Sequence, residues 1–304
     1  MRVLIAGATG VLGRSLLPLL RARGHHVTAM VREPAGAPSA DLTVVADALD
    51  RDAVRAALLV ARPDVVVHQL SALTDRGPLG FEVTARLRTE GTANLLTAAR
   101  EAGARRIVAQ SIAFGTAPVG DPVLTEDAPL YLDAPDEDWA RTVQAIAELE
   151  RLVVGTEGIS DVALRYGTLY GPGTWYARDG AIGALVAAGK MRLPETAGGI
   201  TSFVHVEDAA QAAVLAVESD ATGTFNVTDD DPAEGSAWLP EFAAQLGGPT
   251  PRTIPADLAG RLLGWFTAYQ LTELRGASND RARLSLDWKP SRPSWRGGMV
   301  DDER

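Results

Sequence analysis

Short runs of apolar residues alternate along the first part of the chain with stretches in which apolar residues recur at helical spacing. An uninterrupted apolar run is typical of a strand that is buried on both faces, as in a parallel sheet. A spacing of three or four residues places apolar side chains on one helix face, which then packs on that sheet. The alternation therefore predicts an α/β fold with a doubly wound parallel sheet. The predicted strands are residues 3–6, 26–31, 42–45, 64–68, 106–110 and 162–165, and the predicted helices are residues 11–23, 50–61, 81–102 and 137–155.

The pattern changes after Tyr170, where glycines in the stretch 171–173 mark a loop. Two short apolar runs, 203–206 and 225–227, predict strands that return to the main sheet. We therefore expect a large first domain and a smaller C-terminal lobe. The first domain comprises residues 1–170 with returning segments near 201–228, the lobe comprises 171–200 and 229–304, and helices are expected near 238–246 and 256–274.

Three glycines, Gly7, Gly10 and Gly13, separate the first predicted strand from the first predicted helix. In a dinucleotide-binding turn the first glycine permits the tight turn, the second lets the backbone approach the pyrophosphate, and the third lets helix and strand pack closely. Free N–H groups at the helix start favour the phosphates. This context favours a cofactor site over a purely structural turn. The predicted contacts in the turn are Gly7, Thr9, Gly10, Val11, Leu12 and Gly13.

The end of the second predicted strand indicates which cofactor is bound. An NAD site usually places an acidic residue about 20 residues after the glycines. This chain places Arg32 there, 19 residues after Gly13, and a guanidinium can pair with the 2′-phosphate of NADP. The alternative is that Arg32 is a solvated residue at a strand end. Asp47 and its neighbour Ala48 are predicted to contact the adenine, although Asp47 could instead cap the following helix.

The composition of the chain argues against several classes of function. The 304 residues include 39 acidic and 29 basic side chains, and the net charge of −10 argues against nucleic-acid binding, which needs a clustered basic surface. There is no cysteine and no histidine pair with zinc-ligand spacing, so no metal site is expected. No apolar run reaches the roughly 18 residues of a membrane span, and the N-terminus does not resemble a signal peptide. We expect a cytoplasmic protein without a nucleic-acid or membrane partner.

Five motifs occur in order along the chain: the glycine turn, DVVVHQLSA at 64–72, EGTANLL at 90–96, LRYGTLYGPG at 164–173 and FVHVED at 203–208. Together they resemble the extended short-chain dehydrogenases/reductases of the NAD(P)-dependent epimerase/dehydratase type. The resemblance implies a Rossmann fold with a C-terminal substrate lobe, and NADP, or NAD, as cofactor. It implies further cofactor contacts by Leu70, Ser71 and Ala72, below the nicotinamide ribose. It also implies a homodimer formed through the long helices at 81–102 and 137–155.

The catalytic Tyr-x-x-x-Lys pair of that family is absent from this chain. The resemblance places the pair in the helix predicted over 137–155, where the stretch EDWARTVQAIAELE contains neither tyrosine nor lysine. The chain has only two lysines, Lys190 and Lys289, and neither follows a tyrosine at the required spacing. In the family the lysine lowers the pKa of the tyrosine. A phenol with a pKa of about 10 is a poor base at neutral pH without such help.

Two residues are candidates to replace the missing pair. Ser111, at the carboxyl end of the strand predicted over 106–110, could hydrogen-bond a substrate oxygen, or it could be a capping hydroxyl. Tyr166, at the end of the strand predicted over 162–165, could act as a displaced acid, or it could pack against the cofactor. Weaker alternatives are Gln110, Tyr131 and His205, and the charges of Glu148, Glu150 and Arg151 are predicted to form a solvated helix face.

Three functions are compatible with these residues. The first is an NADPH-dependent reductase that acts on a small carbonyl or enone substrate, and the cofactor turn with Arg32 favours it. The second is an epimerase, dehydratase or isomerase that uses the cofactor transiently or as a scaffold. The third is a non-catalytic protein that senses the cofactor. The fold alone does not choose among them.

Overall fold

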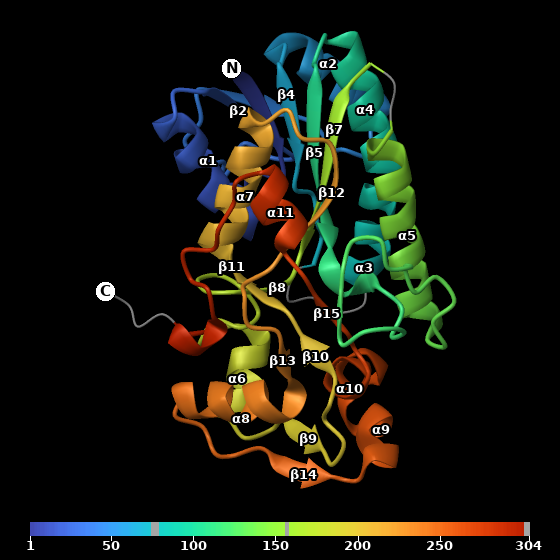
Figure 1. The fold of residues 1–304 in the computed structure, drawn as a ribbon. Helices are drawn as coiled ribbons and strands as arrows, with labels where there is room; N and C mark the ends of the chain where they lie inside the picture. Colours follow the sequence, from blue (N-terminus) through green and yellow to red (C-terminus); the bar gives the residue numbers. More distant parts are fainter. Residues whose placement is uncertain (74–78, 156–157, 301–304) are drawn as a thin grey trace.

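The computed structural model describes residues 1–73, 79–155 and 158–300, and its centre is a seven-stranded parallel sheet (Figure 1). From β1 the sheet grows in one direction through β2 and β3 and in the other direction through β4, β5 and β7. Open α/β sheets bind ligands at the carboxyl ends of the two strands where this direction changes. The predicted doubly wound fold is confirmed. In spatial order the strands are β12 (Gly223–Val227), β7 (Ser160–Tyr166), β5 (Arg106–Ile112), β4 (Val65–His68), β1 (Arg2–Ala6), β2 (His26–Val31) and β3 (Leu42–Val45).

Helices cover both faces of this sheet (Figure 1). Successive side chains of a strand point to opposite faces, so each strand contributes to two cores. In β1, Ile5 packs in one core and Leu4 in the other, and both are fully buried. The helices on the Ile5 side are α1 (Val11–Ala22) and α7 (Val206–Glu218), and those on the Leu4 side are α2 (Arg51–Ala61), α4 (Thr92–Glu101) and α5 (Glu137–Val153).

The long helix predicted over 81–102 is present, but it is not a regular α-helix. It begins as α3 (Leu79–Arg86), continues as a π-helical turn η1 (Leu87–Gly91) and ends as α4. A π-turn adds one residue to a helical turn and is often found at functional sites. The apolar pattern gave no sign of it, because the residues on both sides of the turn keep helical spacing.

The later part of the chain has an aromatic core of its own, in which Phe203, Trp238 and Phe242 are almost fully buried. Within the described residues, no helix combines the length and the apolar character needed to cross a bilayer. The division of the chain near residue 170 stays a prediction. The elements of the lobe are α6 (Ala181–Ala187), β9 (Arg192–Pro194), β10 (Ile200–Thr201), β13 (Ala233–Glu234), α8 (Gly235–Gln245), β14 (Arg252–Ile254), η3 (Ala256–Leu258), α9 (Ala259–Leu263) and α10 (Trp265–Thr272).

Two expectations for the later part of the chain were wrong. β12 joins the main sheet, but β11 (Phe203–His205) pairs instead with β8 (Thr168–Tyr170) in a separate two-stranded sheet. The helix expected over 256–274 is broken at Gly264, whose φ of +82° lies in the left-handed region that ends helices. The remaining elements are η2 (Ala113–Gly115), β6 (Val123–Leu124), β15 (Gly276–Ala277), α11 (Asp280–Ser285) and η4 (Trp295–Gly297).

Candidate cofactor and active site

The glycine turn between β1 and α1 packs too tightly to hold side chains. Gly7 has a φ of +97°, and its carbonyl oxygen accepts the N–H of Gly10 at 3.0 Å. A Cβ atom on Gly7 would lie 2.4 Å from the carbonyl oxygen of Gln69, just after β4. A Cβ atom on Gly13 would lie 2.2 Å from the carbonyl oxygen of Gly7. The turn is therefore pressed against both α1 and the end of β4, as a dinucleotide-binding turn requires.

The start of α1 suits a phosphate group. The N-cap residue is Gly10, so no side chain of the N-cap occupies the N–H groups at the helix start. The first turn carries no acidic residue. Thr9 and Gly10 are exposed, Val11 is half-buried, and the Arg14 guanidinium donates to the Thr9 carbonyl oxygen at 2.8 Å. The N–H groups, the helix dipole and this arginine all favour an anion. Together with Leu12, which is buried against the sheet, these residues fit the pyrophosphate part of NAD(P).

The residues predicted to contact the adenosine end follow β2 and β3. Arg32 comes directly after β2 and is exposed. The Asp47 side chain accepts the backbone N–H two residues ahead at 2.9 Å. The cap of α2 is Asp50, so the alternative in which Asp47 caps this helix is wrong. Ala48 is buried, and its carbonyl oxygen accepts a hydrogen bond from the Asn94 side chain at 2.9 Å.

The segment after β4 is held in place by side chains. The N–H of Leu70 donates to Nδ1 of His68 at 3.2 Å, and the N–H of Ala72 donates to the Thr84 hydroxyl at 3.0 Å. Ser71 is exposed between them. Burial lowers the pKa of His68 to about 4, so its ring is neutral at pH 7. The loop predicted to lie below the nicotinamide ribose therefore has a fixed backbone at the carboxyl edge of the sheet.

Tyr166 ends β7 and lies beside Gln69, which follows β4. The Gln69 side-chain N–H donates to the Tyr166 hydroxyl at 3.4 Å, and both residues are buried. Burial raises the pKa of Tyr166 above that of a free phenol, and the Gln69 hydrogen bond opposes this only partly. Tyr166 therefore keeps its proton at neutral pH. The Oε1 atom of Gln69 is buried without a hydrogen-bond partner among the described residues, so it can accept from a ligand.

Ser111 belongs to a buried ion-pair network. Its hydroxyl donates to Oε1 of Glu150 at 2.6 Å, and Arg165 forms two 2.7 Å hydrogen bonds to the same carboxylate. The charged side chains of Arg165 and Glu150 are only 6% and 10% exposed. The prediction that Glu150 lies on a solvated face is therefore wrong, although Glu148 and Arg151 do pair near the surface. Because the Ser111 proton is committed to Glu150, its hydroxyl can offer a ligand only a lone pair.

The face of α5 that continues from Glu150 is apolar. One and two turns before Glu150 lie the fully buried Ile146 and Val143, and Trp139 follows near the helix start. The Trp139 ring stacks on Phe114 of η2 at a centroid distance of 6.2 Å, and Phe266 of α10 lies 4.5 Å from it. Hydrocarbon and aromatic rings thus occupy the helix where the family resemblance implies a tyrosine and a lysine. The Trp139 indole N–H is buried with no hydrogen-bond partner among the described residues.

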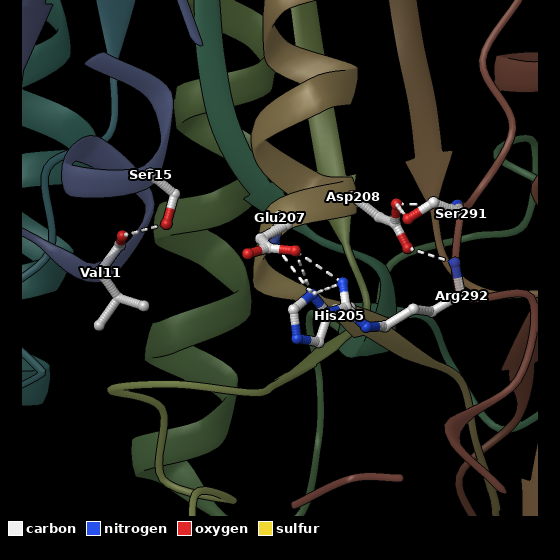
Figure 2. A network of polar contacts seen from close by, with 7 residues as sticks. All are labelled: Val11, Ser15, His205, Glu207, Asp208, Ser291 and Arg292. Atoms are coloured by element: carbon white, nitrogen blue, oxygen red, sulfur yellow. Dashed lines mark hydrogen bonds and ion pairs between the residues drawn. The ribbon is translucent and has the colours of Figure 1, made fainter. Parts of the chain in front are cut away.

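His205, a weaker candidate for catalysis, takes part in the polar network of Figure 2. The side chain is fully buried, and its Nδ1 accepts the N–H of Glu207 at 3.2 Å, which caps α7. Arg292 donates to Glu207 at 2.7 Å and lies 3.0 Å from the same His205 nitrogen. Beside it, the Asp208 carboxylate accepts from Ser291 and from the N–H of Arg292. The network therefore fastens the segment around residues 291–292 to the start of α7.

The loop at 171–173 lies between this network and the glycine turn. A Cβ atom on Gly171 would lie 2.4 Å from Nε2 of His205, and one on Gly173 would lie 3.9 Å from Cγ2 of Val11. Figure 2 shows Val11 and Ser15 of α1 on the other side of the same view. His205 therefore supports a loop that reaches the first residue of the phosphate-binding helix.

Comparison with known proteins identifies the family. Residues 3–228 match the NAD dependent epimerase/dehydratase family. The chain belongs to this family. A Streptomyces relative, named 3-diazoavenalumate denitrifying reductase, is 64% identical over 98% of this chain and 99% of its own length. Sterol demethylase protein B of Methylococcus capsulatus is 30% identical over 85% of this chain and 79% of its own length.

Solved structures of the epimerase/dehydratase family share the fold. The Thermus thermophilus UDP-glucose 4-epimerase in complex with NAD has a TM-score of 0.73 at 24% identity, covering 98% of this chain and 96% of that one. A human epimerase family protein with NADPH has a TM-score of 0.74 at 22% identity, covering 98% of both chains. The predicted class, an NAD(P)-binding oxidoreductase of Rossmann fold, is confirmed.

The sequence did not reveal the role of three buried residues near the carboxyl edge of the sheet, Glu150, Arg165 and Gln69. Glu150 and Arg165 are distant from each other in the chain, and no spacing rule connects a helix residue with a strand residue. A weak signal existed for Arg165, since a charge inside a short apolar strand must find a partner when it is buried. Gln69 directly follows a buried strand, and its position at the carboxyl edge was the only indication.

Replacing Gly10 with alanine is expected to weaken NADPH binding without unfolding the protein. The new Cβ atom would lie 3.3 Å from the Gly7 carbonyl oxygen, a contact that a small shift relieves, but the methyl group would stand where the pyrophosphate approaches. We expect at least about a tenfold loss of affinity, roughly 1.4 kcal/mol, in a fluorescence titration. Gly260→Ala is the control, because nothing lies within 4 Å of its Cβ position. Equal affinities for the two variants would contradict the assignment.

Replacing Glu150 with glutamine is expected to destabilise the fold. The change keeps the side-chain size but leaves Arg165 buried without its counter-charge, which costs about 3 kcal/mol. Urea unfolding, followed by circular dichroism, measures the loss. Glu148→Gln is the matched control on the same helix, because its pair with Arg151 is exposed and screened by water. If both variants unfold at the wild-type urea concentration, the buried ion pair does not have this role.

Proposed function

We propose that the protein is an NADPH-dependent reductase that removes a diazo group from a small organic acid and releases it as dinitrogen. The Streptomyces relative, which shares 64% identity and is named a denitrifying reductase of a diazo acid, supports this proposal. The structural observation that carries it is the composition of α5, which has neither tyrosine nor lysine and whose buried face is made by apolar residues such as Val143 and Ile146. A reduction that transfers no proton to a substrate oxygen fits such a face.

Reduction of a diazo group meets this condition. When bound, NADPH supplies a hydride. The electrophilic atom of the substrate is the terminal diazo nitrogen, which would take the hydride. This nitrogen then gives up its hydrogen as a proton, the carbon–nitrogen bond breaks with its electron pair on carbon, dinitrogen leaves, and the carbon takes up a proton. Overall the substrate gains one hydride and one proton and loses N2, and the proton can come from water. A carbonyl, by contrast, becomes an alkoxide as it is reduced and needs an acid within reach of its oxygen.

The residues at the edge of the sheet have limited roles in such a reaction. We assign Ser111 and Tyr166 to contacts with the substrate or the nicotinamide rather than to proton transfer. Ser111 offers a lone pair, because its proton is committed to Glu150. Tyr166 holds its own proton firmly, because burial raises its pKa. The half-buried ring of Phe114, which stacks on the buried Trp139, offers an aromatic contact for a conjugated substrate.

Several expectations remain predictions alongside this function. They are the contacts of Leu70, Ser71 and Ala72 with the nicotinamide ribose, the cytoplasmic location, and the homodimer through the helices at 81–102 and 137–155. The preference for NADP over NAD belongs with them, and Arg32 is the residue on which it depends.

The purified protein is expected to oxidise one NADPH for each dinitrogen released from 3-diazoavenalumate. Absorbance at the reduced nicotinamide band and mass spectrometry of the headspace gas, with a 15N-labelled diazo group, measure the two quantities. Nitrogen release without NADPH oxidation, or NADPH oxidation without nitrogen release, would refute the proposal.

The same assay separates the other candidate functions. A panel of small carbonyls and enones tests the substrate class expected from the family, with Tyr166→Phe as the decisive variant. Loss of carbonyl turnover in that variant would make Tyr166 an acid, whereas nitrogen release should survive the change. Turnover without net change in NADPH would instead favour an epimerase or dehydratase.

Replacing Arg32 with alanine is expected to raise the Kd for NADPH about 10- to 100-fold, because charge-assisted bonds to the 2′-phosphate are lost. The Kd for NADH, which lacks that phosphate, should stay within about twofold, so the variant carries its own control. Calorimetric titration of both nucleotides measures the difference. An equal loss for both would assign Arg32 to the adenosine and not to the phosphate.

A further inference from the structure

Three arginines are buried among the described residues, and only one of them has no partner. Arg165 pairs with Glu150, and Arg106 donates to the carbonyl oxygens of Ala216 and Ala221 and to serine hydroxyls. Arg88 is 7% exposed, and its guanidinium makes no hydrogen bond or ion pair within the described part of the chain. Burial lowers the pKa of Arg88 to about 10, so it is still charged at pH 7. A buried charge of this kind is costly unless a ligand supplies the counter-charge.

The position of Arg88 follows from its neighbours on the helix. Thr84, Arg88 and Thr92 are spaced four residues apart on the long helix, and all three are buried. The Thr84 hydroxyl bonds the N–H of Ala72 at 3.0 Å, and the Thr92 hydroxyl lies 2.9 Å from Nε2 of His68. Arg88 therefore stands between two contacts to the segment 68–72, which forms the carboxyl edge beside the glycine turn. The positive charge of Arg88 also acts on His68, which confirms that the two are close.

No carboxylate in the described ranges 1–73, 79–155 and 158–300 pairs with this charge. Glu150 is committed to Arg165 and Ser111. Glu90 is half exposed and pairs with Arg86, on the outer side of the helix. The π-turn η1 places Arg88 on the inner face, and such turns are often kept for function rather than stability. None of the described residues therefore supplies the counter-charge, and we expect a ligand to supply it.

We propose that Arg88 binds the negative end of the substrate and thereby activates its diazo group for reduction. This inference rests on the proposed function. A diazo compound is a zwitterion whose positive charge lies on the N2 group and whose negative charge lies on the carbon or on an oxygen conjugated to it. A guanidinium at the negative end draws electron density away from the N2 group, so the terminal nitrogen becomes a better hydride acceptor. The substrate class is thus a conjugated diazo compound with an electron-rich oxygen.

This role also accounts for the lost tyrosine and lysine. A proton relay stabilises developing negative charge by giving it a proton, and its success depends on matched pKa values. A guanidinium stabilises the same charge without moving a proton, because it stays protonated throughout. Arg88 supplies this fixed charge, and the apolar face of α5 needs only to exclude water from it.

The first test compares Arg88→Met, Arg88→Lys and the control Arg86→Met, which removes an exposed arginine two residues away. We expect Arg88→Met to lower kcat/KM for 3-diazoavenalumate about 10- to 100-fold, with the lysine variant in between and the control unchanged. The Kd for NADPH should stay within about twofold in every variant. The melting temperature of Arg88→Met should equal or exceed that of wild type, because an uncompensated buried charge is removed. Unchanged kcat/KM, or weakened NADPH binding instead, would overturn the proposal.

The second test needs no turnover. Infrared spectroscopy of 3-diazoavenalumate, bound to the protein with NADP+, reports the N–N stretch of the diazo group, identified by 15N substitution. Contact with Arg88 should raise this frequency toward that of a diazonium ion, and Arg88→Met or Arg88→Lys should lower it again. Equal frequencies in wild type and both variants would overturn the role of Arg88 even if the wild type releases nitrogen. Conversely, a wild type that shows the frequency shift but releases no nitrogen would refute only the proposed reaction.

Discussion

The carboxyl edge of the sheet depends on one buried carboxylate. Glu150 of α5 accepts from Ser111 of β5 and from Arg165 of β7, so a single side chain joins one helix to two adjacent strands. Arg165 also donates to the carbonyl oxygen of Glu126, whose own carboxylate accepts the N–H of Asn226 in β12. Since neither buried charge is tolerated alone, the helix and three strands must adopt one relative arrangement. That arrangement fixes the position of the apolar face of α5 relative to the sheet.

The same helix shows what replaced the usual chemistry of the family. In an enzyme that protonates an oxygen, α5 would have to carry groups that exchange protons near neutral pH. Here the buried face of α5 carries the apolar side chains of Val143 and Ile146 next to the ion pair of Glu150 with Arg165. Burial also raises the pKa of Tyr166. We assign charge stabilisation to Arg88, on the neighbouring helix of the same sheet face and in a turn of unusual geometry. The glycine turn of the family is retained, while α5 has neither the tyrosine nor the lysine of the family.

Sequence patterns predicted the parts of this structure that are determined by residues close together in the chain. Apolar runs predicted each strand of the seven-stranded sheet, and the spacing of Gly7, Gly10 and Gly13 predicted the glycine turn, because these features depend on neighbouring residues. Patterns failed where distant segments decide the outcome. Glu150 was assigned to the surface because its sequence neighbours Glu148 and Arg151 are at the surface, and its partner lies on a strand. β11 was assigned to the main sheet because an apolar run does not specify its pairing partner.

The contact between Gly171 and His205 has a consequence for the order in which the site is completed. His205 is joined to Arg292, and the loop that rests on His205 reaches Val11, so segments very far apart in the sequence meet around the phosphate-binding turn. During synthesis the turn emerges long before the segment around Arg292, which fixes the loop above it. The cofactor pocket therefore closes through contacts of very long sequence separation, which form late and slowly. A growing chain carries the binding turn long before it can hold a nucleotide in a finished site.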